Sequence, residues 1–138
     1  MSAINEIIRL EADGTISFGD YTASQKKKIA DFDVFGDRYS VKTHAEITRI
    51  EKNGWLLLET VPGAAIHRFS LTEELVGFAA EGAGDTQITL ELELEPSTGY
   101  SVAVGGVSIG GVESGLSGKV TISVELSADP RDVKVGKN

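Results

Sequence analysis

The feature that most constrains the fold of this chain is a regular alternation of apolar and polar residues. In 86–94 every second residue, beginning at Ile88, is apolar, and the segment 119–126 repeats the pattern from Val120 onward. A shorter instance lies in 100–104. A β-strand sorts such residues onto two faces, whereas an α-helix would scatter them around its circumference. These segments therefore predict strands with one buried and one solvated face.

Turn signals divide the rest of the chain into further short strands. Asp13-Gly14 and Asn53-Gly54 are dipeptides that favour the positive-φ positions of tight hairpins, and Pro62-Gly63 ends the apolar run that begins at Trp55. These signals give roughly ten or eleven strands, about 8–12 residues apart, which is typical of sandwiches and barrels. The predicted fold class is all-β, an antiparallel two-sheet β-sandwich that is jelly-roll-like.

The length of 138 residues favours one domain, which we place at 1–128. The polar segment 129–138 is predicted to be a weakly attached C-terminal tail, although Val133 and Val135 could add an edge strand. The stretch 105–118 holds six glycines and no helical pattern follows it. We interpret it as two tight turns around a short strand and not as a dinucleotide-binding loop.

The charge balance argues against two classes of binding partner. With 13 basic and 21 acidic residues the net charge is −8, which disfavours nucleic acid and membrane surfaces. The run Lys26-Lys27-Lys28 is interpreted as a solvated loop or a guard on an edge strand. There is no cysteine, so disulfides and cysteine nucleophiles are excluded. The first residues carry no secretory signal pattern, so we expect a soluble, acidic, cytoplasmic protein.

Candidate catalytic groups are few. His44 and His67 are 23 positions apart, which is not a metal-ligand spacing, so neither a metal nor another cofactor is expected. Glu91 and Glu93 could form the carboxylate pair of a small glycoside hydrolase. Their alternation with leucines is better explained as the solvent side of a sheet. Whether the protein is an enzyme is left open, with the balance against it.

The single tryptophan leaves two interpretations open. If the leucines of 56–58 face the core in one register, Trp55 faces outward and could stack on a sugar ring, joined by Tyr21, Tyr39 and Tyr100. In the other register Trp55 belongs to the core or to a subunit contact, which the aromatic content of only 7% favours. The candidate ligand-binding residues are accordingly Trp55, Tyr39 and Tyr100.

The chain also resembles a known group of proteins. The residues that carry the resemblance are Ile4-Asn5-Glu6-Ile7-Ile8-Arg9-Leu10, Gly14-Thr15-Ile16-Ser17-Phe18-Gly19-Asp20-Tyr21, Tyr39-Ser40-Val41-Lys42-Thr43 and Ile47-Thr48-Arg49-Ile50-Glu51-Lys52-Asn53-Gly54. They are similar to short β-sandwich proteins of clostridial-type bacteria, some of which are labelled endosialidase-like. The resemblance spans nearly the whole chain but includes no catalytic motif, so it implies no site residue. The run 100–106 with the 119–126 strand also looks like the closing hairpin of sugar-handling β-sandwiches, by analogy of fold alone.

These observations favour a non-catalytic binding or accessory module with a carbohydrate or peptide ligand. One alternative is a structural protein that forms homo-oligomers through sheet edges or faces. The other is the small glycoside hydrolase.

Overall fold

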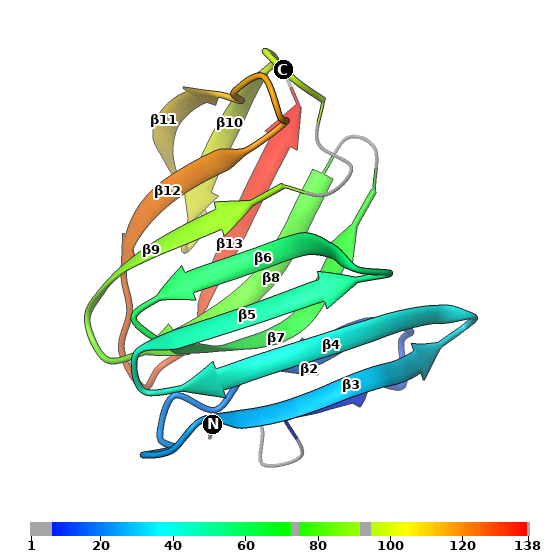
Figure 1. Ribbon diagram of the computed structural model, residues 1–138. Coiled ribbons are helices and arrows are strands. Elements are labelled where there is room, and N and C mark those ends of the chain that lie inside the picture. The colour runs from blue at the N-terminus through cyan, green and yellow to red at the C-terminus, as the bar shows by residue number, and fades with distance from the viewer. Residues whose placement is uncertain (1–6, 73–74, 92–94, 138) are drawn as a thin grey trace.

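The computed structural model describes residues 7–72, 75–91 and 95–137, and its strands form two antiparallel sheets that face each other (Figure 1). The seven-stranded sheet has the order β1 (Ile8–Leu10), β2 (Ile16–Phe18), β7 (Ala64–Leu71), β8 (Leu75–Gly82), β13 (Arg131–Lys137), β10 (Gly99–Val104) and β11 (Val107–Glu113). The six-stranded sheet has the order β12 (Val120–Glu125), β9 (Asp85–Leu90), β6 (Trp55–Val61), β5 (Ile47–Lys52), β4 (Asp37–His44) and β3 (Lys27–Val34). This arrangement confirms the predicted antiparallel two-sheet sandwich. Among the described residues no helix is long and apolar enough to cross a membrane.

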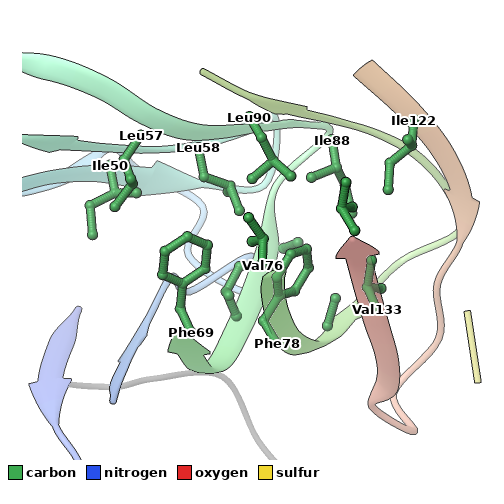
Figure 2. Packing of buried hydrophobic residues seen from close by; sticks show 14 of the residues in the cluster. Ile50, Leu57, Leu58, Phe69, Val76, Phe78, Ile88, Leu90, Ile122 and Val133 are labelled. Atoms are coloured by element: carbon green, nitrogen blue, oxygen red, sulfur yellow. The ribbon is translucent and has the colours of Figure 1, made fainter. Parts of the chain in front are cut away.

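The core lies between the two sheets. Figure 2 shows Leu58 and Leu90 of the six-stranded sheet pointing toward Val76 and Phe78 of the seven-stranded sheet. The ring of Phe69 stacks on that of Phe78, with 5.8 Å between the ring centroids. Such apolar packing is the main favourable term in folding, at about 25 cal/mol per Å² of apolar surface removed from water.

The alternating segments form strands with the predicted faces. Ile88 of β9 and Val120, Ile122 and Val124 of β12 are all buried, and the polar residues between them on β12 are exposed. Strand β9 ends at Leu90, and the predicted continuation through 92–94 lies outside the described residues. The Asp13-Gly14 and Asn53-Gly54 signals also hold, because the first lies in the turn between the paired strands β1 and β2 and the second joins β5 to β6.

The C-terminal segment differs from the expected tail. Residues 131–137 form β13, which lies in the interior of the seven-stranded sheet between β8 and β10. Val133 and Val135 are completely buried against the other sheet, which explains the difference. Two valines at alternating positions are enough to give a short polar segment an inward face, and hydrogen bonding on both edges holds the rest. With β13, the described residues form 13 strands, which is above the number expected.

The outer strands explain two further sequence features. β3 is the last strand of the six-stranded sheet, and Lys26, Lys27 and Lys28 are exposed on or beside it, as predicted for a guarded edge. The glycine-rich stretch forms β11 and its flanking turns, as expected, and Val107 and Ile109 of β11 are exposed.

Asp20 attaches the segment between β2 and β3 to this edge strand. Its carboxylate accepts hydrogen bonds from the backbone and hydroxyl of Thr22, and Lys27 Nζ lies 2.8 Å from Oδ2. Burial by itself would raise the pKa of Asp20, but the hydrogen bonds from Lys27 and Thr22 outweigh it. The pKa of this carboxyl therefore lies below its usual range.

This depressed pKa predicts a specific loss of stability in acid. Since the unfolded chain binds the proton at about pH 3.9 and the folded chain at lower pH, the contribution of Asp20 is full above about pH 4 and disappears as the pH falls through the folded-state pKa. We expect Asp20→Asn to lower the free energy of unfolding at pH 7 by about 1 to 3 kcal/mol. We also expect it to flatten the dependence of that free energy on pH below 4. Urea unfolding between pH 7 and pH 2 measures both, with the exposed Asp129→Asn as the control. Parallel pH curves for Asp20→Asn and the unmodified protein would contradict the assignment.

Candidate ligand-binding cleft

A cleft of about 250 Å³ opens between the two sheets at the end that carries the β3–β4 and β5–β6 turns. Figure 1 shows these two turns side by side at the right-hand end of the six-stranded sheet. The cleft is lined by Gly14, Thr15 and Ile16, by Val34, Phe35, Asp37 and Tyr39, by Lys52 and Leu57, and by Phe69, Ser70 and Leu71.

The lining combines an apolar floor with polar groups. Ile16, Val34, Leu57 and Phe69 are buried side chains of the core and form the apolar part. The polar part comes from the hydroxyl groups of Thr15 and Ser70, the carboxylate of Asp37 and the ammonium group of Lys52. Ligand sites typically have this composition, with a mostly apolar surface and a few polar groups that fix orientation. The volume lies below the range of about 300 to 1,000 Å³ for drug-sized ligands, so it suits one residue of a chain ligand.

The two turns beside the cleft have the same geometry. In the first, Phe35 and Gly36 have φ of 52° and 91°, and in the second, Asn53 and Gly54 have φ of 52° and 86°. Both are two-residue turns with positive φ at both central positions, which is the type I′ hairpin turn. Asn53-Gly54 is a preferred sequence for this turn, but phenylalanine is not, because its Cβ crowds the backbone in the left-handed region.

Asn53 and Asp37 tie the two turns together. The backbone N–H of Asn53 donates to Arg38 O at 2.7 Å, and Asn53 Oδ1 accepts from Arg38 N at 3.0 Å. Asn53 Nδ2 donates to Asp37 Oδ1 at 3.1 Å, and Lys52 Nζ lies 3.9 Å from Asp37 Oδ2. The carboxylate of Asp37 thus joins both hairpins while it lines the cleft, so the cleft's polar wall is fixed in position.

Two aromatic side chains project at these turns. Phe35 is 82% exposed and Trp55 is 71% exposed. A left-handed conformation costs a bulky residue about 1 to 2 kcal/mol, and the exposed ring of Phe35 buries little surface to offset it. Backbone strain that the fold does not need is a recognised indication of a functional position.

The predicted ligand-binding residues are only partly brought together. Trp55 and Tyr39 both pair in register with Lys52, so the three lie in one row across β4, β5 and β6. Tyr100 was placed wrongly with them: it lies on β10 in the other sheet, is 2% exposed, and its hydroxyl accepts a hydrogen bond from Glu95 N at 2.9 Å. A tyrosine at an inward strand position packs its ring and needs only one polar partner for the hydroxyl.

The core interpretation of Trp55 is wrong as well, because Trp55 lies at the end of β6 and is 71% exposed. The alternation of β6 is also broken. Ile50 pairs with Leu58 but Glu51 pairs with Leu56, so Leu57 is an extra residue in the ladder. Leu57 and Leu58 are therefore both buried, and the extra residue puts Trp55 on the same face of the sheet as Lys52. Strict alternation, in either of the two registers, could not have predicted that two consecutive leucines are buried.

Phe35 was not among the predicted site residues. The available signal was the Phe35-Gly36 pair between two alternating segments, which marks a turn but normally carries a small or polar first residue. A large aromatic residue at a turn position is a departure from turn chemistry, and such departures are where functional residues are found.

The candidate metal and catalytic residues do not form a site among the described residues. His44 lies in the six-stranded sheet and His67 in the seven-stranded sheet. Among the described residues, no group of three or more histidine or carboxylate side chains could hold a metal. Glu91 is half-buried just after β9, and Glu93 lies outside the described residues.

His67 instead belongs to a buried polar network. Its Nε2 lies 2.7 Å from Glu81 Oε1, and the hydroxyl of Tyr21 donates to Glu81 Oε2 at 2.9 Å. Burial, followed by the hydrogen bond to Glu81, raises the pKa of Tyr21 to about 12. His67 and Glu81 are at most 4% exposed and line none of the clefts described here, which assigns the network to structure and not to ligand binding.

Comparison of the chain with protein-family models, with curated proteins and with solved structures finds no match.

Proposed function

We propose that this protein is a non-catalytic binding module that holds one residue of a carbohydrate chain in the cleft, with Phe35 and Trp55 stacking on the neighbouring sugar rings. The observation that carries the proposal is the exposed ring of Phe35, held at a strained turn position next to the turn that precedes Trp55. The negative face of an aromatic ring attracts the weakly positive C–H groups on a sugar face, so exposed aromatic rings suit this ligand.

The polar lining supports the same ligand class. Sugar hydroxyls both donate and accept hydrogen bonds, and the cleft offers the hydroxyl group of Ser70 and the hydroxyl oxygen of Thr15, whose own hydrogen is donated to Asp13 Oδ1. Asp37 adds an acceptor and Lys52 a donor, while the buried floor would contact the apolar side of the ring.

Catalysis is disfavoured by the carboxylates of the cleft. Glycoside hydrolysis uses two, roughly 5 to 9.5 Å apart, whereas Asp37 is the carboxylate that the lining residues supply. Asp37 is also hydrogen-bonded to Asn53 and faces Lys52, which keeps it in a fixed positioning role.

The self-association alternative has one observation of its own. β11 is the last strand of the seven-stranded sheet and exposes Val107 and Ile109, and Leu116 after it is 90% exposed. Unpaired strand edges with apolar side chains are common association surfaces. Homo-oligomerisation therefore stays a prediction beside the binding function.

Binding to the cleft can be followed directly because Trp55 is the single tryptophan. We expect titration with neutral oligosaccharides to change its fluorescence, and calorimetry to give at least about tenfold weaker binding for Phe35→Ala and for Trp55→Ala, which corresponds to ~1.4 kcal/mol. Leu116→Ala, which removes an equally exposed apolar side chain elsewhere, should bind as the unmodified protein does. Unchanged affinity in both aromatic variants would refute the site, and binding of unstructured peptides at the same residues in place of sugars would replace the ligand class.

A further inference from the structure

A row of three basic side chains crosses the outer face of the six-stranded sheet. Lys28 of β3 lies directly opposite Lys42 of β4, and Lys42 lies directly opposite Arg49 of β5. Register partners point to the same face of a sheet, and Figure 1 shows the three strands side by side. The row is therefore a continuous basic strip on a protein whose net charge is −8.

The two ends of this row are neutralised differently. Arg49 Nη1 lies 2.7 Å from Glu59 Oε2, and Arg49 Nε lies 3.2 Å from Glu51 Oε2, so its charge is fully compensated within the protein. Lys28 and Lys42 contact no carboxylate within the described parts of the chain, although Lys27 next to them has Asp20. Like charges directly opposite each other on neighbouring strands repel, so this pair costs stability unless an anion lies between them.

The surface between these side chains is hollowed. A shallow groove of about 490 Å³ is lined by Lys28, Lys42, Arg49 and Glu51 together with Ser40 and the backbone around Ile29. It faces away from the core, whereas the cleft with Phe35 lies between the sheets, so the two can be occupied independently.

We propose that this groove binds the carboxylate of an acidic sugar residue, with Lys28 and Lys42 as the two cationic contacts. Three cations and the two carboxylates of Glu51 and Glu59 leave one net positive charge, which matches a monoanion such as a carboxylate better than a doubly charged phosphate. The choice of a sugar as the carrier of this carboxylate rests on the proposed function of the cleft. The anion site itself depends only on the row.

The overall negative charge limits how the groove works. The net negative charge provides no attraction for an approaching acid, and salt screens charge interactions beyond the Debye length of about 8 Å, so the groove can select an acid only in contact. We therefore expect the gain from the carboxylate to be modest and to fall with salt.

The test compares an oligogalacturonate with the neutral oligogalactose of equal length, by calorimetry at constant ionic strength. We expect the acidic oligomer to bind the unmodified protein about tenfold more tightly, and the variant with both Lys28→Gln and Lys42→Gln to bind the two oligomers equally. The variant with both Lys119→Gln and Lys134→Gln carries the same loss of charge at exposed sites elsewhere and should keep the preference. Circular dichroism confirms that each variant is folded.

The outcomes separate this inference from the proposed function. Equal affinity of the unmodified protein for both oligomers, or an equal loss of preference in the Lys119/Lys134 control, overturns the anion site. If the neutral oligomer does not bind but sodium galacturonate shifts backbone amide NMR signals around Lys28 and Lys42, the anion site stands and the proposed function of the cleft fails. A response to acetate equal to that for galacturonate would overturn the sugar as the carrier.

Discussion

Deletion of residues 130–138 is expected to leave a chain that does not fold. The deletion removes β13 from the interior of the seven-stranded sheet and leaves β8 and β10 as unpaired edges on either side of the gap. It also removes Val133 and Val135, both completely buried. A domain of ordinary stability, about 5 to 15 kcal/mol, cannot lose a central strand. Circular dichroism and one-dimensional NMR of the truncated protein measure the result.

Single substitutions in the same strand make this expectation quantitative. Val133→Ala should lower the free energy of unfolding in urea by about 2 to 3 kcal/mol, because it removes buried methyl groups and leaves a cavity. Lys134→Ala, at the exposed neighbouring position, should change it by less than about 0.5 kcal/mol. A truncated chain with native chemical-shift dispersion would show that β13 is dispensable and would contradict the assignment.

The second large effect is expected from Glu81. Glu81→Ala should lower the free energy of unfolding by about 3 to 5 kcal/mol, since it leaves the buried imidazole of His67 and the half-buried hydroxyl of Tyr21 without their partner. His67 has no other side-chain hydrogen bond that could compensate, because its Nδ1 already lacks a partner among the described residues. Urea unfolding at pH 7 provides the measurement.

A matched pair of variants tests the reason for this loss. Tyr21→Phe removes one hydroxyl from a half-buried side chain and should cost only about 1 kcal/mol. Glu81→Leu combined with His67→Phe replaces both members of the buried pair by apolar groups and should recover part of the stability lost in Glu81→Ala. A Glu81→Ala protein within 1 kcal/mol of the unmodified one would mean that water reaches the network.

Much of the fold could be predicted because its signals are local. The alternation in β9 and β12 depends only on successive residues facing opposite sides, and the Asn53-Gly54 turn depends on two residues. The position of β13 could not be predicted in this way. Its place between β8 and β10 depends on strands far away in the sequence, and a polar strand with two valines resembles an edge or a tail until its neighbours are known.

The candidate site was predictable only in part for the same reason. Tyr39 and Trp55 could be named from their residue types, but the extra residue in β6 that puts Trp55 in one row with Lys52 and Tyr39 is a property of pairing with β5. The same holds for the network of His67 and Glu81, which are 14 positions apart and meet because β7 and β8 are paired. The local sequence pattern predicts where a strand lies, but the pairing of strands determines which side chains come into contact.

The way in which the two hairpin tips are attached to each other has a practical consequence. The hairpin tips at Phe35-Gly36 and Asn53-Gly54 are fastened to each other through Asp37 and Asn53 and take little part in the core. The exposed side chains of Phe35 and Trp55 can therefore be varied in a display library while Asp37, Asn53 and the two turn glycines are kept to hold the strand register. The molecule is in this sense a cysteine-free scaffold from which binders of new specificity could be selected.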